Sequence, residues 1–175
     1  MKLSRRAATG IMTAAIFTPF ASVSAQTDGI DVISLLETEH REAKRLVDGI
    51  LASNDATERD RLLHTLANAL TIHNANEENI VYPAIMNQAG RPDDAAMLYH
   101  QQDDSKVIIA ELMRLPKTSA RFTSRCQDLR TALWAHIHQE EAVDFPALQS
   151  ALGSNIAALD AATSRLRAHW VANPA

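Results

Sequence analysis

One phrase occurs twice in this chain, and it constrains the fold more than any other feature. HNANEENIVYPAI at 73–85 aligns without a gap with HIHQEEAVDFPAL at 136–148. In each copy a glutamate follows the first histidine by four residues and a proline follows it by ten. Residues four apart lie about 40° apart around an α-helix, so each copy presents an imidazole and a carboxylate on one face. This spacing is typical of metal ligands.

The rest of the chain reads as helix. From residue 31 onward apolar residues recur at three- and four-residue spacing. Aromatic residues make up only 5% of the chain and there are five glycines, so strands and tight turns have little support. Breaks are expected at 53–55, 90–92 and 116–119. Four long helices with short connections predict an all-α, antiparallel four-helix bundle over 30–152.

The C-terminal segment, 153–175, is expected to hold one further helix and a tail. From Ser154 to Val171 the larger apolar residues share one side, which predicts a short fifth helix packed against the bundle. The alternative is that this helix binds a partner protein.

Four histidines and two glutamates fall inside the apolar stripes of the predicted bundle: His40, His73, Glu77, His100, His136 and Glu140. The histidines are paired at similar separations, 33 residues for the first two and 36 for the last two, so the chain looks like two related helical hairpins. A buried carboxylate loses much of its solvation energy unless it is paired, and no lysine or arginine shares these stripes. We therefore expect a bound cation.

The donor set narrows the choice of metal. Four imidazoles and two carboxylates are too many for one tetrahedral zinc ion, and no cysteine is among them. Imidazole with carboxylate suits iron, and the duplication suits two irons that share bridging carboxylates. Ferritin-like di-iron bundles use Glu-x-x-His motifs, whereas the order here is His-x-x-x-Glu, so that family does not fit.

Between His40 and Pro146 the chain resembles the hemerythrin-like, or HHE cation-binding, family. The resemblance rests on ETEHRE, HNANEENIVYP, LYHQQDD and HIHQEEAVDFP, one motif on each predicted helix. It implies a four-helix bundle with two iron ions joined by an oxo or hydroxo bridge and two carboxylates. The ligands implied are a pair of histidines for each iron and two bridging glutamates: His40 with His73, His100 with His136, and Glu77 with Glu140.

Some positions depart from the oxygen-carrying hemerythrins. Asp104 stands where those carriers have a fifth histidine, and their last carboxylate corresponds to Glu141. Glu140 is preferred as the bridge because it matches Glu77 in the repeat, and Asp104 and Glu141 are kept as additional ligand candidates. The missing imidazole argues against simple reversible oxygen carriage. Tyr82 and Phe145 are equivalent in the repeat and are expected to wall off the site.

These features predict an exported, non-haem di-iron protein that binds O2, NO or peroxide for sensing, scavenging or storage. A metal- and small-ligand-binding protein is favoured over a dedicated enzyme. The alternatives are a di-iron peroxidase or catalase-like enzyme that reduces peroxide or oxygen, and an interaction bundle with a vestigial metal site. A sensor would need a separate protein partner, and turnover would need an electron donor.

Residues 1–25 are expected to be a cleaved export signal, which places the mature protein in the periplasm. They have a basic start, an apolar middle and a small-residue end, and the pair Arg5-Arg6 favours the twin-arginine route. The apolar stretch is too short and broken for a membrane anchor. Cleavage of residues 1–25 would remove Lys2, Arg5 and Arg6 and no acidic residue, so the formal net charge would change from −4 to −7. Such a negative charge disfavours a nucleic-acid partner.

Replacing Arg5 and Arg6 together with lysine should block export, because the twin-arginine route reads the arginine pair itself. Fractionation of cells that express the full chain, followed by immunoblotting, measures this. Unaltered export of the double variant would favour the general secretion route.

Overall fold

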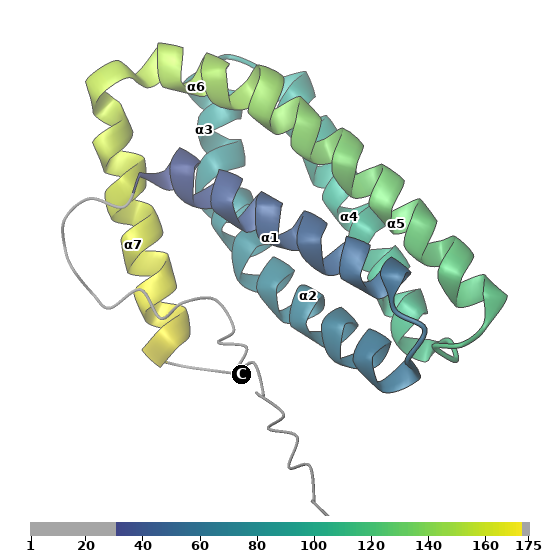
Figure 1. Cartoon of the computed structure of the whole chain (residues 1–175). Coiled ribbons are helices and arrows are strands. Elements are labelled where there is room, and N and C mark those ends of the chain that lie inside the picture. Colours follow the sequence, from purple (N-terminus) through teal and green to yellow (C-terminus); the bar gives the residue numbers. More distant parts are fainter. Residues whose placement is uncertain (1–30, 173–175) are drawn as a thin grey trace, which may run out of the picture.

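The chain folds into the predicted bundle of four long antiparallel helices. The computed structural model describes residues 31–172, and the expected export signal lies outside them. The four long helices are α1 (Val32–Ala52), α2 (Ala56–Asn76), α4 (Pro92–Arg114) and α5 (Ala120–Gln139). Each packs against two others, since α1 contacts α2 and α5, and α4 also contacts both (Figure 1). The all-α prediction is confirmed.

Short polar side chains set where the helices begin. Asp31 accepts hydrogen bonds from the backbone N–H groups at the start of α1, and Asp55 does so for α2. Ser119 accepts from the N–H of Phe122 at the start of α5. α4 begins at Pro92, whose missing N–H costs nothing in the first turn of a helix. The breaks between helices therefore fall where the sequence predicts them.

Two of the long helices continue without a break through a π-turn. After α2 come the π-turn η1 (Glu77–Val81) and α3 (Tyr82–Asn87), and after α5 come η2 (Glu140–Asp144) and α6 (Phe145–Leu152). Each π-turn begins at the glutamate of the repeated phrase.

The repeated proline accounts for the repeated π-turn. A proline cannot donate a backbone hydrogen bond to the residue four before it, so Pro83 and Pro146 each interrupt the α-helical ladder. The residue before each proline bonds one position further back, with the Tyr82 N–H donating to Glu77 O and the Phe145 N–H to Glu140 O. Such i→i−5 turns are often found at functional sites. The sequence repeat is thus also a repeat of backbone geometry.

The buried side chains form an apolar cluster towards each end of the bundle and a polar layer between them. Along each of the four helical segments the order is apolar, polar, apolar. The buried members of the polar layer are Glu39, His40, His73, Asn76, Glu77, Gln102, Ser105, His136 and Glu140. The candidate site is therefore a belt across the middle of the core.

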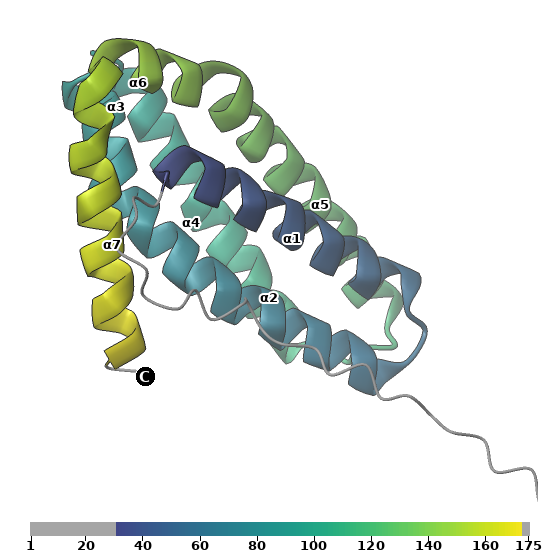
Figure 2. The same cartoon turned by 60° about the vertical axis from the view of Figure 1, so that its left-hand side comes forward.

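The expected fifth helix is α7 (Ile156–Ala172). It follows the short 3-10 turn η3 (Gly153–Asn155), where Gly153 has a positive φ of 50°. α7 lies across one end of the bundle and contacts α1, α2 and η1 (Figures 1 and 2). None of the helices within residues 31–172 has both the length and the apolar character needed to span a bilayer.

Candidate metal centre

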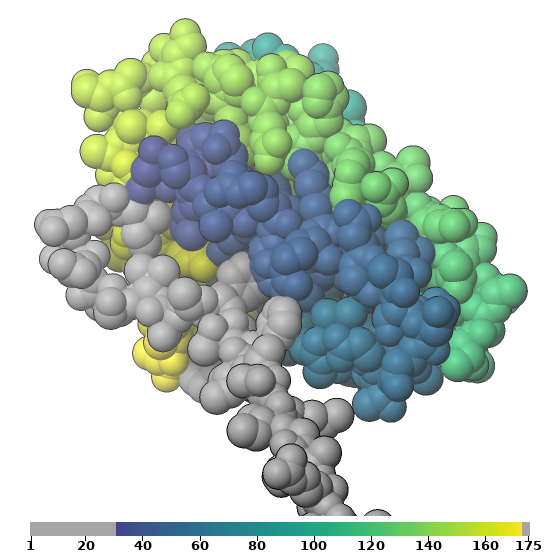
Figure 3. Space-filling model, in the orientation of Figure 1, coloured from purple at the N-terminus to yellow at the C-terminus, as the bar shows by residue number. Residues whose placement is uncertain are grey.

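Three histidines and two glutamates meet in the middle of the polar layer. His40 comes from α1, His73 from α2 and His136 from α5, and each is at most 4% exposed. Glu77 and Glu140, at the starts of the two π-turns, are fully buried. On the face shown in Figure 3, the side chains of α1 lie between those of α2 and α5 in a continuous surface. The centre is enclosed by the bundle.

Every imidazole directs its Nε2 atom at a carboxylate. His73 Nε2 lies 3.2 Å from Glu77 Oε1, and His136 Nε2 lies 3.3 Å from Glu140 Oε1. His40 Nε2 lies between the two glutamates, 3.2 Å from Glu140 Oε2 and 3.7 Å from Glu77 Oε1. The two oxygens of Glu140 therefore face different histidines, as a bridging carboxylate would.

The ligand atoms form two overlapping groups, each with its atoms within 4.8 Å of one another. One group is His40, His73 and Glu77, and the other is Glu77, His136 and Glu140. Because Glu77 belongs to both, the arrangement suits two adjacent cations rather than one.

The opposite nitrogen of each imidazole is also held. His40 Nδ1 lies 2.9 Å from Glu141 Oε1, and His73 Nδ1 lies 3.1 Å from Glu39 Oε2. His136 Nδ1 lies 2.9 Å from Gln101 Oε1. All three partner atoms are acceptors, so each Nδ1 carries the proton and donates it. Metal-binding histidines in proteins are oriented in this way, with the lone pair of Nε2 left for the metal.

Several atoms at the centre lack a hydrogen-bond partner among the described residues. They are His40 Nε2, Glu77 Oε1 and Glu140 Oε2, all fully enclosed. A buried polar atom without a partner costs about 1–3 kcal/mol. A cation bound between these atoms would satisfy all of them, so the donor set fits a metal.

The carboxylates change the protonation of the histidines. Burial lowers the pKa of His40, but Glu140 and Glu77 outweigh it and raise the pKa to about 9. Burial likewise lowers the pKa of His73, whereas Glu77 and Glu39 raise it to about 10. Burial acts to raise the pKa of Glu77, yet His73 and His40 hold it well below its ordinary value. Before a metal binds, the glutamates are balanced by protons on these imidazoles.

The structure does not bring His100 to the centre. His100 is exposed on α4 and lies outside the ligand groups of residues 31–172, whereas Gln102, two residues later, is 2% exposed and faces the centre. Two residues correspond to about 200° around a helix, so the two side chains point to nearly opposite sides. Val107, which lies seven residues after His100 and therefore on the same side of α4, is 55% exposed.

The correct stripe on α4 contains polar residues, which concealed it. Its buried members are Ala95, Leu98, Gln102, Ser105, Ile108 and Leu112, at three- and four-residue spacing. Reading Gln102 and Ser105 as interior positions would have placed this helix correctly. Histidine is a more familiar metal ligand than glutamine, so the presence of His100 favoured the wrong face of α4 as the buried one.

Tyr82 enters the centre more deeply than the expected wall. Its hydroxyl donates to Glu140 Oε1 at 2.7 Å, lies 3.2 Å from Glu77 Oε2 and accepts from Gln102 Nε2 at 2.7 Å. Burial and the two carboxylates hold its pKa well above the ordinary value, so the phenol keeps its proton. Phe145, the equivalent residue of the second copy, stacks on the His40 ring with 5.9 Å between centroids.

The centre is therefore asymmetric although the sequence is repeated. The side nearest α1 and α2 supplies two imidazoles, His40 and His73. The side nearest α4 and α5 supplies one imidazole, His136, together with the Gln102 amide and the Tyr82 phenol.

The two additional ligand candidates lie elsewhere. Asp104 is exposed on α4, outside both ligand groups. Glu141 is half-buried and holds the Nδ1 atom of His40 rather than facing the centre.

A small cavity adjoins the histidine side of the centre. Its volume is about 20 Å³, and its walls include His40, His73, His136 and Ser105. That space admits a molecule about the size of water. Lys106 of α4, whose side chain is 44% exposed, also lines the cavity.

His136→Ala should remove most of the metal bound at the α5 side, because it deletes the one imidazole there, while His100→Ala should leave metal content unchanged. Elemental analysis of both variants after identical loading with Fe2+ measures this. Equal losses in the two variants would contradict the placement of α4.

Metal binding should release protons at pH 7.5, because a cation must displace those held by His40 and His73. Their folded pKa values of about 9 and about 10 exceed the unfolded value of 6.5. The stability that these protons give the metal-free protein is thus full below pH 6.5 and is lost as the pH rises through about 9 to 10. Metal affinity should rise over the same interval.

Calorimetric titration with Zn2+ in two buffers of different ionisation enthalpy measures the released protons. Identical heats in both buffers would show that none is displaced.

The chain is similar to proteins of a known family. The family model for the hemerythrin HHE cation-binding domain matches residues 31–148. In a solved structure, a hemerythrin HHE cation-binding domain-containing protein from Mycobacterium kansasii shares the fold with a TM-score of 0.61 and 21% identity, over 83% of this chain and 94% of that one.

A second relative has a name that points to a different function. A DNA nickase from Nostoc sp. is 25% identical over 136 residues, which are 75% of this chain. The chain spans only 38% of that relative's length. The match to the family model covers most of the chain and contains all five residues that converge on the centre. The chain belongs to the hemerythrin HHE cation-binding domain family.

Proposed function

We propose that the centre holds two iron ions, bridged by Glu77, Glu140 and an oxo or hydroxo group, and that the protein binds O2, NO or peroxide there. The observation that carries the proposal is the convergence of three Nε2 atoms on two shared, fully buried carboxylates. Imidazole with carboxylate is a donor set that suits iron. Bound iron would supply reversible electron transfer to a small ligand.

The chain's own residues would set the selectivity. His40 and His73 would hold one ion with two imidazoles, whereas His136 would hold the other with one. The ion beside His136 would therefore have fewer protein donors and more room for a small ligand. The cavity of about 20 Å³ admits diatomics and peroxide and excludes larger substrates. Phe145 stacks on His40 and helps keep bulk water out.

Peroxide consumption is a second candidate, and the position of Tyr82 favours it. Its protonated hydroxyl is 2.7 Å from Glu140 and accepts a hydrogen bond from Gln102. A phenol held in this way can give a proton to a ligand oxygen and recover one from solvent. General acid catalysis of this kind contributes about 10²–10⁴-fold.

DNA cleavage, the activity for which the Nostoc relative is named, is less well supported here. A nuclease must bring its metal to a phosphodiester between two sugars. The glutamates of this centre are fully buried and the adjoining cavity holds only a very small molecule. We further propose that the mature protein acts in the periplasm, supported by the pattern of residues 1–25.

Anaerobic reconstitution with Fe2+ tests the metal centre. The expected result is about two iron ions per chain and, after exposure to oxygen, absorption from an oxo-bridged pair that bleaches on reduction. Fewer than about one iron per chain would sink the proposal.

Repeated additions of peroxide to the loaded protein separate binding from turnover. If Tyr82 is the acid, Tyr82→Phe should keep its iron and lose turnover by about 10²-fold. Tyr99→Phe is the matched control, because Tyr99 packs edge-on against Tyr82 with 5.0 Å between ring centroids but donates its hydroxyl to Glu78 O. Equal turnover in the two variants would show that Tyr82 is not the acid, and the absence of sustained turnover in the parent protein would leave ligand binding as the function.

A further inference from the structure

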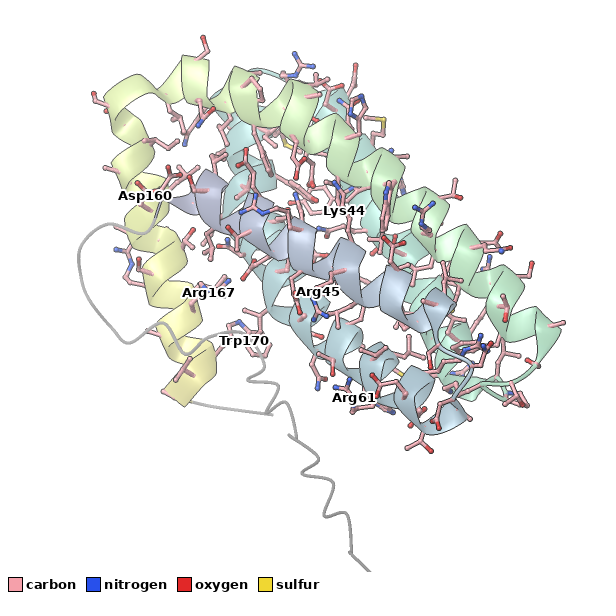
Figure 4. The ribbon with its side chains drawn as sticks, in the orientation of Figure 1. Lys44, Arg45, Arg61, Asp160, Arg167 and Trp170 are labelled. Carbon is pink, nitrogen blue, oxygen red and sulfur yellow. The ribbon has the colours of Figure 1, made fainter. Side chains whose placement is uncertain are left out.

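α7 is tied to α1 by two polar contacts that lie seven residues apart on each helix. Asp160 Oδ1 accepts a hydrogen bond from the Val32 N–H at 2.9 Å. Arg167 lies 2.6 Å from Glu39 Oε1. Asp160 and Arg167 lie on the side of α7 that faces the bundle (Figure 4). The first contact anchors the start of α1, and the second reaches the polar layer.

Glu39 links Arg167 to the metal centre. Its Oε1 atom meets the guanidinium, and its Oε2 atom accepts from His73 Nδ1 at 3.1 Å. Glu39 is only 6% exposed, so few other groups can take either place. Arg167 of α7, Glu39 of α1 and His73 of α2 thus form a continuous chain of polar contacts that ends at a candidate metal ligand.

The orientation of His73 depends on Arg167 because both side chains contact the carboxylate of Glu39. A buried carboxylate is stabilised only when it is paired, and a charge-assisted bond to a guanidinium has a defined direction. With one oxygen held by Arg167, the carboxylate plane is fixed and the other oxygen stays in front of His73. Without Arg167, Glu39 would gain freedom to rotate towards solvent, and the imidazole would lose its orientation.

The other two histidines are held differently. Glu141, which accepts from His40, is 33% exposed, and Gln101, which accepts from His136, is an uncharged residue of α4. Both partners belong to the part of the chain matched by the family model, which ends at residue 148. Arg167 lies beyond it, on a helix that the family match does not include.

We propose that Arg167 is a positioning residue for the metal centre, acting through Glu39 to keep the Nε2 atom of His73 directed at the metal. α7 is then part of the site although it supplies no ligand. The proposal rests on the metal centre described above, and one of its tests is made on metal-free protein.

Four substitutions in the full chain isolate the contact. Arg167→Met removes the guanidinium and keeps a long side chain. Arg165→Met is the matched control, because Arg165 is exposed on the same helix two residues earlier. Asp160→Ala removes the other contact with α1, so it separates the effect of Arg167 from looser packing of α7. Glu39→Gln examines the same contact from the other side.

The first measurement is the rate at which zinc-loaded protein gives up its metal to excess chelator. Loss of a group that orients a metal ligand costs about 10–100-fold in metal affinity, so Arg167→Met and Glu39→Gln should release zinc roughly tenfold faster than the parent. Arg165→Met and Asp160→Ala should stay within about twofold. A parent-like rate in either test variant overturns the proposal, as does an equal increase in Asp160→Ala.

The second measurement is proton NMR of the metal-free protein, where the hydrogen-bonded Nδ1 proton of His73 should give a slowly exchanging downfield signal. The signal should weaken or vanish in Arg167→Met and persist in Arg165→Met. Its persistence in Arg167→Met overturns the positioning role. Because no metal is needed, failure here is distinct from failure of the parent protein to bind metal, which would refute the proposed function instead.

Discussion

The burial of Glu77 and Glu140 in the middle of a four-helix bundle is the constraint on which the rest of the structure depends. Two carboxylates without solvent need positive charge, and in the metal-free protein the imidazoles of His40 and His73 supply it as protons. The apolar clusters on either side of the polar layer hold those helices together. The groups behind the imidazoles fix which nitrogen faces inwards. Packing thus holds in place a group of residues that would be unfavourable without a cation.

The two copies of the repeated phrase have the same backbone geometry, but they contribute different side chains to the site. Both copies place a glutamate at the start of a π-turn and a proline after it, so the two halves bring their carboxylates in alike. The aromatic residue before each proline makes the difference. Tyr82 adds a proton donor between the carboxylates, whereas Phe145 covers His40 with a flat apolar face. A single hydroxyl group separates the chemistry of the two halves.

Much of this could be read from the sequence because helical periodicity and His-x-x-x-Glu spacing are local properties. The bundle was predicted in this way, and five of the six residues expected as ligands lie together in the polar layer. His100 was misplaced because the inward face of α4 carries Gln102 and Ser105, which a search for apolar stripes passes over. The π-turns and the role of Glu39 escaped notice for another reason. One depends on how a proline shifts hydrogen bonds along the helix, and the other on a contact with Arg167, far away in the sequence.

The three imidazoles come from segments separated by 33 and 63 residues, and this has a consequence for folding. Cations bound in the two ligand groups, which share Glu77, would close two long loops together and restrict the unfolded chain much as a covalent cross-link does. With one cysteine the chain has no internal disulfide of its own. Bound metal would then stabilise the folded bundle as well as provide its chemistry. Unlike a disulfide, this cross-link would not depend on thiol oxidation.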